Sequence, residues 1–195
     1  MNDTHLIEAT MRWVDDIVIN HNFCPFAGFV RQPGQIHCVV VNGNSGDVIA
    51  SLFDECKRLD EKDDIATTLI IAPSSSTASF DDYLDVLAIC DRMLSDWGYS
   101  GVYQLASFHP DYQFDGEAKD SVANYTNRSP YPLLHLIRER DIARYMKNED
   151  DAEKIYTHNI AKANELGCPY FEKALNEMRD EASKKTHSLN SKTPK

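Results

Sequence analysis

Two short stretches of the chain concentrate side chains that could do chemistry. ASFHPDYQFDG, residues 106–116, contains His109 and Asp111, and NYTNRSPYPLLHLIRE follows at residues 124–139. Histidine titrates near neutral pH, so His109 is a candidate general acid–base with Asp111 beside it. Arginine presents a planar fork that binds a carboxylate or phosphate through two hydrogen bonds, which makes Arg128 a candidate anion ligand.

The second stretch is predicted to begin a helix at Ser129, because proline is favoured in the first helical position and Pro130 follows. With Ser129 as N-cap, free backbone N–H groups could bind an anion beside Arg128. The helix is predicted to extend to about Met146 and to place three side chains on one face: His135, Arg138 and Glu139. For Glu139 we prefer a solvated position. The predicted substrate-binding residues are Arg128, Asn124, Asn127, Ser129, Arg138 and Tyr112.

Cys24 is the third candidate, in NFCPFAG at the end of a predicted helix. A thiolate near an arginine or a protonated histidine is a better nucleophile than a free cysteine. One cysteine and two histidines also form a ligand set suited to zinc or iron. We therefore predict that Cys24 is a nucleophile or, with His109 and His135, a metal ligand; the alternative is a small buried residue.

Three motifs together resemble domain-of-unknown-function family 1415, whose members are mostly bacterial proteins. They are WVxxIVxxxNFCPFA, ASFHPDYQF and NYTNRSPYPxLHLIRE, and the resemblance covers roughly residues 5–168. It implies family membership and carries over no catalytic roles. The motif positions that match are Asn22, Cys24, Pro25, His109, Pro110, Tyr112, Asn124, Asn127, Arg128, His135, Arg138, Glu139 and Asn159.

The rest of the chain must position these residues. Apolar residues at helical spacing predict helices over residues 4–20, 47–60, 80–97, 129–146, 151–166 and 169–184. Runs of β-branched apolar residues predict strands over residues 36–42, 67–73 and 101–108. Strands that alternate with helices favour parallel pairing with right-handed crossovers. We expect an α/β fold: a small three-stranded parallel sheet from βαβαβ units, packed with an N-terminal helix and a helical C-terminal third.

His109 and Asp111 would lie at the carboxyl edge of this sheet, where ligands bind in open α/β folds. The loop over residues 109–128 is longer than a simple connection, and loops of this length are often functional. We expect a single domain over residues 1–182 and a polar tail over residues 183–195 that is disordered.

The composition of the chain limits the classes of partner and the cellular location that we expect. The net charge of −11 repels phosphate backbones, so we expect no nucleic-acid partner. The chain has no apolar run of membrane length, and acidic residues replace the basic start of a signal peptide, which predicts a cytoplasmic protein with no membrane contact. Five cysteines without a CxxC pair indicate reduced thiols. Nucleotide-binding motifs are missing from the sequence.

Three functions fit these patterns. The leading hypothesis is a hydrolase or transferase that acts on a small anionic substrate, with Arg128 holding the anion and His109 moving protons. The second is a non-catalytic protein that binds a metal or ligand with the same residues. The third is an interaction domain whose polar loop is a structural brace, which requires Arg128, Asn124 and Asn127 to be spent on backbone carbonyls.

Overall fold

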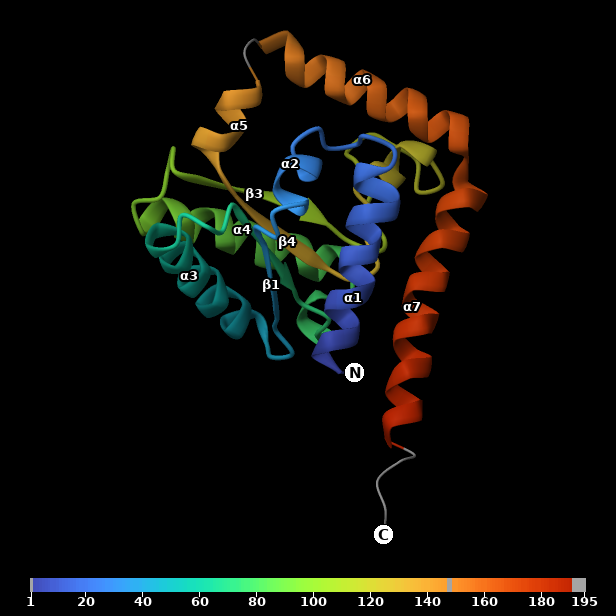
Figure 1. Cartoon of the computed structure of the whole chain (residues 1–195), viewed down its shortest axis with the longest axis horizontal. Coiled ribbons are helices and arrows are strands. Elements are labelled where there is room, and N and C mark those ends of the chain that lie inside the picture. Colours follow the sequence, from blue (N-terminus) through green and yellow to red (C-terminus); the bar gives the residue numbers. More distant parts are fainter. Residues whose placement is uncertain (1, 147–148, 191–195) are drawn as a thin grey trace.

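A four-stranded sheet with the strand order β1-β2-β4-β3 forms the centre of the computed structural model, which describes residues 2–146 and 149–190 (Figure 1). Its strands are β1 (Ile36–Val40), β2 (Thr67–Ile71), β3 (Tyr103–Phe108) and β4 (Leu133–Arg138). The α-helices are α1 (Asp3–Trp13), α2 (Ala27–Arg31), α3 (Ser45–Glu61), α4 (Phe80–Asp96), α5 (Glu139–Tyr145), α6 (Glu149–Leu166) and α7 (Cys168–Asn190). A π-helical segment, η1 (Val14–Ile19), and two 3₁₀ segments, η2 (Ser75–Thr77) and η3 (Val122–Thr126), complete the structure.

The α/β class is confirmed, but the prediction of a three-stranded parallel sheet is wrong. β1 pairs with β2 in parallel across the α3 crossover, whereas β4 is antiparallel to both β2 and β3. The three predicted strands still run in one direction, because β4 is antiparallel to the two strands that flank it. The missed strand therefore lies at the centre of the sheet and changes the pairing of β3.

The helix predicted over residues 129–146 is also wrong, since its middle forms β4. Pro132 disfavours a helical conformation at Tyr131, and Ser129 donates its hydroxyl to the Tyr131 carbonyl at 2.6 Å instead of capping a helix. The run LLHLIR then buries side chains on both faces, as is typical of a central strand. His135, Arg138 and Glu139 consequently do not share a helical face, and the helix resumes only as the short α5.

Helices cover both faces of the sheet. α3 and α4 pack on one face around Leu134, Leu136 and Ile70, and α1, η1 and α7 pack on the other around Leu133, Leu69 and Ile71. α1 and α7 lie side by side in Figure 1, at the opposite side of the sheet from α3 and α4. The remaining predicted strands and helices are found close to their predicted bounds.

The predicted N-terminal helix changes type after Trp13. In η1 the hydrogen bonds span five residues, as from the Phe23 N–H to the Val18 carbonyl at 2.9 Å. The chain then reverses at Asn22, whose φ of 55° lies in the left-handed region that asparagine tolerates. This reversal carries Cys24 and α2 back toward the sheet.

The C-terminal helices are as long as, or longer than, the sequence pattern predicts. α6 ends before Gly167, whose φ is 75°, and α7 is described as far as Asn190. The last part of the predicted tail, residues 191–195, lies outside the described residues. Within the described part of the chain, none of the helices combines the length and apolar character needed to cross a membrane.

Candidate functional site

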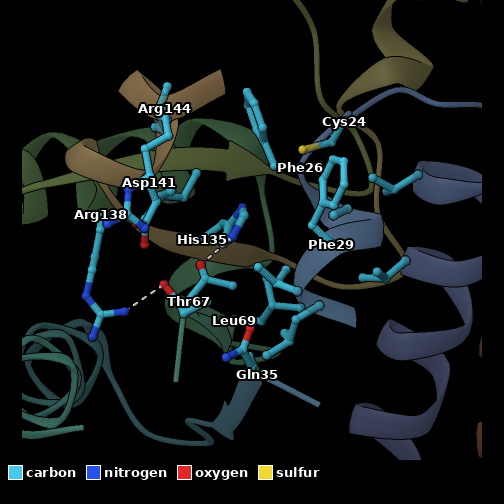
Figure 2. A pocket seen from close by; sticks show the side chains of 18 of the residues that line it. Cys24, Phe26, Phe29, Gln35, Thr67, Leu69, His135, Arg138, Asp141 and Arg144 are labelled. Atoms are coloured by element: carbon cyan, nitrogen blue, oxygen red, sulfur yellow. Dashed lines mark hydrogen bonds and ion pairs between the residues drawn. The ribbon is translucent and has the colours of Figure 1, made fainter. Parts of the chain in front are cut away.

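An apolar pocket of about 290 Å³ lies against the face of the sheet that α1 and η1 only partly cover. Its walls come from η1, α2, the starts of β1 and β2, β4 and α5 (Figure 2). Most of its lining is apolar and includes four aromatic side chains: Trp13, Phe26, Phe29 and Phe108. The polar side chains that line it include Cys24, Thr67, His135, Arg138, Arg140, Asp141 and Arg144.

His135 stands on β4, cross-strand from Leu69 of β2 and Ala106 of β3. Its Nε2 lies 2.7 Å from the Thr67 hydroxyl, and that hydroxyl also lies 2.6 Å from the Leu136 carbonyl. Because a carbonyl can only accept, the Thr67 proton goes to Leu136, and Nε2–H of His135 donates to Thr67. The other ring nitrogen, Nδ1, is therefore an acceptor.

The only side-chain hydrogen bond of His135 among the described residues is the one at Nε2, and Nδ1 is not one of their buried unpaired atoms, so it is accessible from the pocket. Figure 2 shows the ring extending into the pocket, with one nitrogen toward Thr67. Desolvation lowers the pKa of His135 to about 4, so the ring is neutral at pH 7. The pocket thus contains a fixed, uncharged acceptor within an apolar wall.

Cys24 lines the same pocket from the turn between η1 and α2, and its sulfur points toward the interior in Figure 2. Asn159 of α6 donates to the Phe23 carbonyl at 3.0 Å and so holds this turn. Burial raises the pKa of the Cys24 thiol, although hydrogen bonds from the backbone N–H groups of Phe26 and Ala27 act in the opposite direction. The thiol is therefore protonated at neutral pH.

Arg138 is buried behind the pocket and ties β4 to the end of α3. Its two terminal nitrogens donate to four backbone carbonyls, those of Leu59, Lys62, Ile65 and Ala66. Carbonyls at a helix C-terminus lack intrahelical partners, so this arginine satisfies groups that would otherwise be buried unpaired. These contacts favour a structural role for Arg138, which we had predicted to bind substrate.

The rim of the pocket is charged. Arg144 donates to Asp141 at 3.2 Å, and Arg140 lies 3.5 Å from Asp63 and 4.0 Å from Asp141. The arginines of these pairs are largely exposed, as is Asp63, whereas Asp141 is 28% exposed. Pairs with such exposed partners contribute little to folding. Sequence reasoning missed these rim residues; the run RERDIAR, with three arginines in seven positions, was the available signal.

His109 lies outside the lining of this pocket and is fully buried at the carboxyl end of β3. Its Nδ1 accepts from the Asp111 N–H at 3.0 Å, so Nε2–H donates to the Thr77 carbonyl, also at 3.0 Å. Burial lowers the pKa of His109, an effect that the Thr77 carbonyl and the Asp111 charge partly offset. Both ring nitrogens are occupied in the neutral form, and the Phe80 ring packs beside it.

The other predicted substrate ligands form an internal network in the same segment, residues 109–129, which we call the polar loop. Arg128 donates to the carbonyls of Tyr112 at 3.2 Å and Lys119 at 2.8 Å and stacks over the Tyr125 ring at 4.4 Å. Asn124 accepts from the Phe114 N–H and donates to the Ala118 carbonyl. Asn127 donates to the Ser107 carbonyl at 3.1 Å. This is the pattern that the brace hypothesis requires.

The structure brings some predicted residues together and separates others. Cys24, His135 and Arg138 line one pocket, while His109, Asp111, Arg128 and both asparagines belong to the polar loop. The predicted metal set of Cys24, His109 and His135 therefore does not assemble. In residues 2–146 and 149–190, no group of three or more histidine, cysteine, aspartate or glutamate side chains is placed to hold a metal ion.

Comparison with known proteins places the chain in a family. None of the curated proteins and none of the solved structures that were searched matches it. The family model described as protein of unknown function (DUF1415) matches residues 5–173, which is most of the chain and includes both the pocket and the polar loop. The chain therefore belongs to the DUF1415 family.

Proposed function

We propose that this protein binds a small, mostly apolar molecule that carries a hydrogen-bond donor, such as a hydroxyl, for Nδ1 of His135. The observation that carries the proposal is that this acceptor lines an apolar pocket without a protein partner. A ligand that fills the pocket would cut this acceptor off from water, and leaving it unpaired would then cost free energy that a hydroxyl on the ligand avoids. We therefore expect the pocket to bind a molecule with such a hydroxyl more tightly than the same molecule without it.

The dimensions of the pocket set the size of the ligand. At about 290 Å³ it lies near the lower limit of small-molecule sites, which suits one substituted ring or a short chain. Trp13, Phe26, Phe29 and Phe108 offer ring surfaces to such a ligand. A hydroxylated aromatic compound combines the shape and the donor that this lining favours.

Binding without turnover is the better-supported form of the function. A nucleophilic cysteine needs a thiolate, but burial raises the pKa of Cys24 and lowers that of His135. Both groups are then uncharged at neutral pH, unlike a thiolate–imidazolium pair. The uncharged groups thus favour the second hypothesis from the sequence, a non-catalytic ligand-binding protein, over the enzyme hypothesis. The residues that we propose to bind the ligand are those of the pocket instead of those of the polar loop.

The test is calorimetric titration of 3-(4-hydroxyphenyl)propionamide and of 3-phenylpropionamide, which lacks the hydroxyl. We expect wild-type protein to bind the hydroxylated probe about fivefold more tightly, the contribution of one hydrogen bond of about 1 kcal/mol. His135→Leu should make the two affinities equal while thermal unfolding shows a folded protein. Equal affinities in the wild type, or no binding of either probe, would contradict the proposal.

A pair of larger side chains locates the binding. Ala27→Phe should reduce the affinity for the hydroxylated probe at least tenfold, because Ala27 lines the pocket and the new ring would occupy it. Ala50→Phe, on an exposed position of α3, adds the same side chain away from the pocket and should change nothing. Equal effects of both substitutions would place the probe elsewhere.

A thiol enzyme is the second candidate. It is favoured by Cys24, which lines the same pocket as a neutral imidazole and whose sulfur accepts two backbone N–H groups that would stabilise a thiolate. Nδ1 of His135 would take the thiol proton as the sulfur attacks an ester carbonyl, and would return it to the alkoxide as the C–O bond breaks, so that a thioester forms and the alcohol leaves. With 4-nitrophenyl butyrate this predicts one equivalent of released 4-nitrophenol and a butyryl mass on Cys24. A Cys24→Ala variant with unchanged release would exclude it.

A further inference from the structure

Arg140 lies between two cavities. A second cavity of about 230 Å³ lies beyond the rim of the pocket, lined by Leu59, Asp60, Val102 and Tyr103 among others. Three residues line both cavities: Asp63, Arg138 and Arg140. Arg140 therefore borders both cavities with a side chain that is 63% exposed, whereas the guanidinium of Arg138 is held by backbone carbonyls.

The hydrogen-bonding capacity of Arg140 is unused within the described residues. Its contacts to Asp63 at 3.5 Å and to Asp141 at 4.0 Å are longer than the 2.7–3.2 Å typical of N–H···O bonds. Asp141 is instead hydrogen-bonded to Arg144, and the side chain of Asp63 is 96% exposed. An anionic group of a bound ligand could displace Asp63 from Arg140 at little cost in free energy, because exposed ion pairs contribute less than about 1 kcal/mol.

We propose that Arg140 binds a carboxylate of the ligand, so that the pocket recognises apolar acids with a hydroxyl at the other end. This inference rests on the proposed function and names the class of its ligand. The acceptor and the cation line the same pocket from consecutive elements: His135 from β4 and Arg140 from the start of α5.

A carboxylate is the anion of choice because it carries a single charge, whereas Asp63 and Asp141 near this guanidinium would repel a doubly charged anion more strongly. Asp63 and Asp141 lie 3.5 Å and 4.0 Å from the guanidinium without forming a hydrogen bond, so its N–H groups are available to a ligand that displaces the exposed Asp63 side chain. A ligand carboxylate fixed by its apolar body could form the two parallel bonds that the fork offers. The ligand would then bridge the rim and the buried acceptor.

The experiment compares 3-(4-hydroxyphenyl)propionate with its uncharged amide by calorimetric titration at pH 7.5. Wild-type protein should bind the acid about five- to tenfold more tightly than the amide, as expected of a partly exposed charge-assisted pair. Arg140→Gln should abolish this preference, so that the variant binds the acid and the amide with equal affinity. Higher salt should reduce the preference for the acid, because the pair is accessible to ions.

Arg92→Gln is the matched control. Arg92 lies on α4, its side chain is 83% exposed, and it has a long contact to Asp96 at 3.8 Å that resembles the pairing of Arg140. This variant should keep the full preference for the acid. Equal binding of acid and amide by the wild type, or a preference that survives Arg140→Gln, would overturn the inference while the amide data still support the proposed function. Failure of both probes to bind would overturn both.

Discussion

The polar loop and the pocket differ in how their polar groups are satisfied. In the polar loop the side chains of His109, Asn124, Asn127 and Arg128 all bond to the backbone of the loop and its neighbours. In the pocket Arg140, Asp141 and Arg144 lie at the rim, and Nδ1 of His135 has no partner among the described residues. A dense group of satisfied polar side chains specifies a conformation, whereas an acceptor that is open to a pocket keeps its capacity to form a further hydrogen bond.

The polar loop has a mechanical role that also reaches the pocket. The Trp13 indole, which lines the pocket, donates to the Arg128 carbonyl at 3.1 Å. The Trp13 ring also packs edge-on against Phe108, the last residue of β3. The loop therefore fixes one wall of the pocket without contributing a polar group to it.

The largest expected effect separates the two histidines. His109→Ala should lower the free energy of unfolding by about 3 kcal/mol, because it leaves a cavity and removes the partners of the Thr77 carbonyl and the Asp111 N–H. Urea titration measures this change. The variant should still bind 3-(4-hydroxyphenyl)propionamide below its unfolding temperature. A stable variant that has lost binding would assign His109 to the site instead of the brace.

The pH dependence of stability tests the state of His135. Its pKa of about 4 in the folded protein lies below the ordinary value of 6.5, so the unfolded chain binds the proton first. The stabilising contribution is complete above pH 6.5 and is lost as the pH falls toward 4, by up to about 3 kcal/mol.

His135→Leu isolates this contribution from the carboxylates that titrate in the same range. The unfolding free energy of the wild type minus that of His135→Leu should fall as the pH is lowered from 6.5 to 4. Urea titration at closely spaced pH values measures this difference. A constant difference across this window would mean that His135 is not held in its neutral form.

The smallest expected effect concerns the exposed part of the brace. Arg128→Met should lower the free energy of unfolding by about 1–2 kcal/mol, because it removes two hydrogen bonds and a cation–π contact but keeps an apolar stem. Affinity for the acid probe should not change. A selective loss of affinity for the acid, with the amide unaffected, would restore Arg128 as the anion ligand and displace Arg140.

Much of the fold could be predicted from local patterns. Ser79 caps α4 by accepting the Asp82 N–H at 3.1 Å, and Gly98 follows the helix with φ of 84°, both as the sequence signals indicate. β4 could not be predicted in the same way, because a run of apolar residues that is buried on both faces has no alternation to distinguish it from a helix. Its antiparallel insertion between β2 and β3 depends on long-range packing.

The site was predictable only in part. Cys24 and His135 were singled out by residue type, and both line the pocket, but the reason given for His135 was a helical face that does not exist. The positions of His109 at the end of a strand and of Arg128 beside an expected helix start suggest a site, but both side chains bond to backbone groups instead. Residue type alone does not show whether a donor or acceptor already has a hydrogen-bond partner in the protein. The presence of such a partner distinguishes a structural side chain from one that can bind a ligand.

The most direct test of the central claim is an NMR measurement of the imidazole nitrogens of His135 and His109 in the same sample. We predict that at pH 7 both rings are neutral with the proton on Nε2, as their hydrogen bonds require. Adding 3-(4-hydroxyphenyl)propionamide should shift the Nδ1 resonance of His135, as it accepts a new hydrogen bond, and leave that of His109 unchanged. A proton on Nδ1 of His135 in the free protein, or no shift on addition of the probe, would contradict the account.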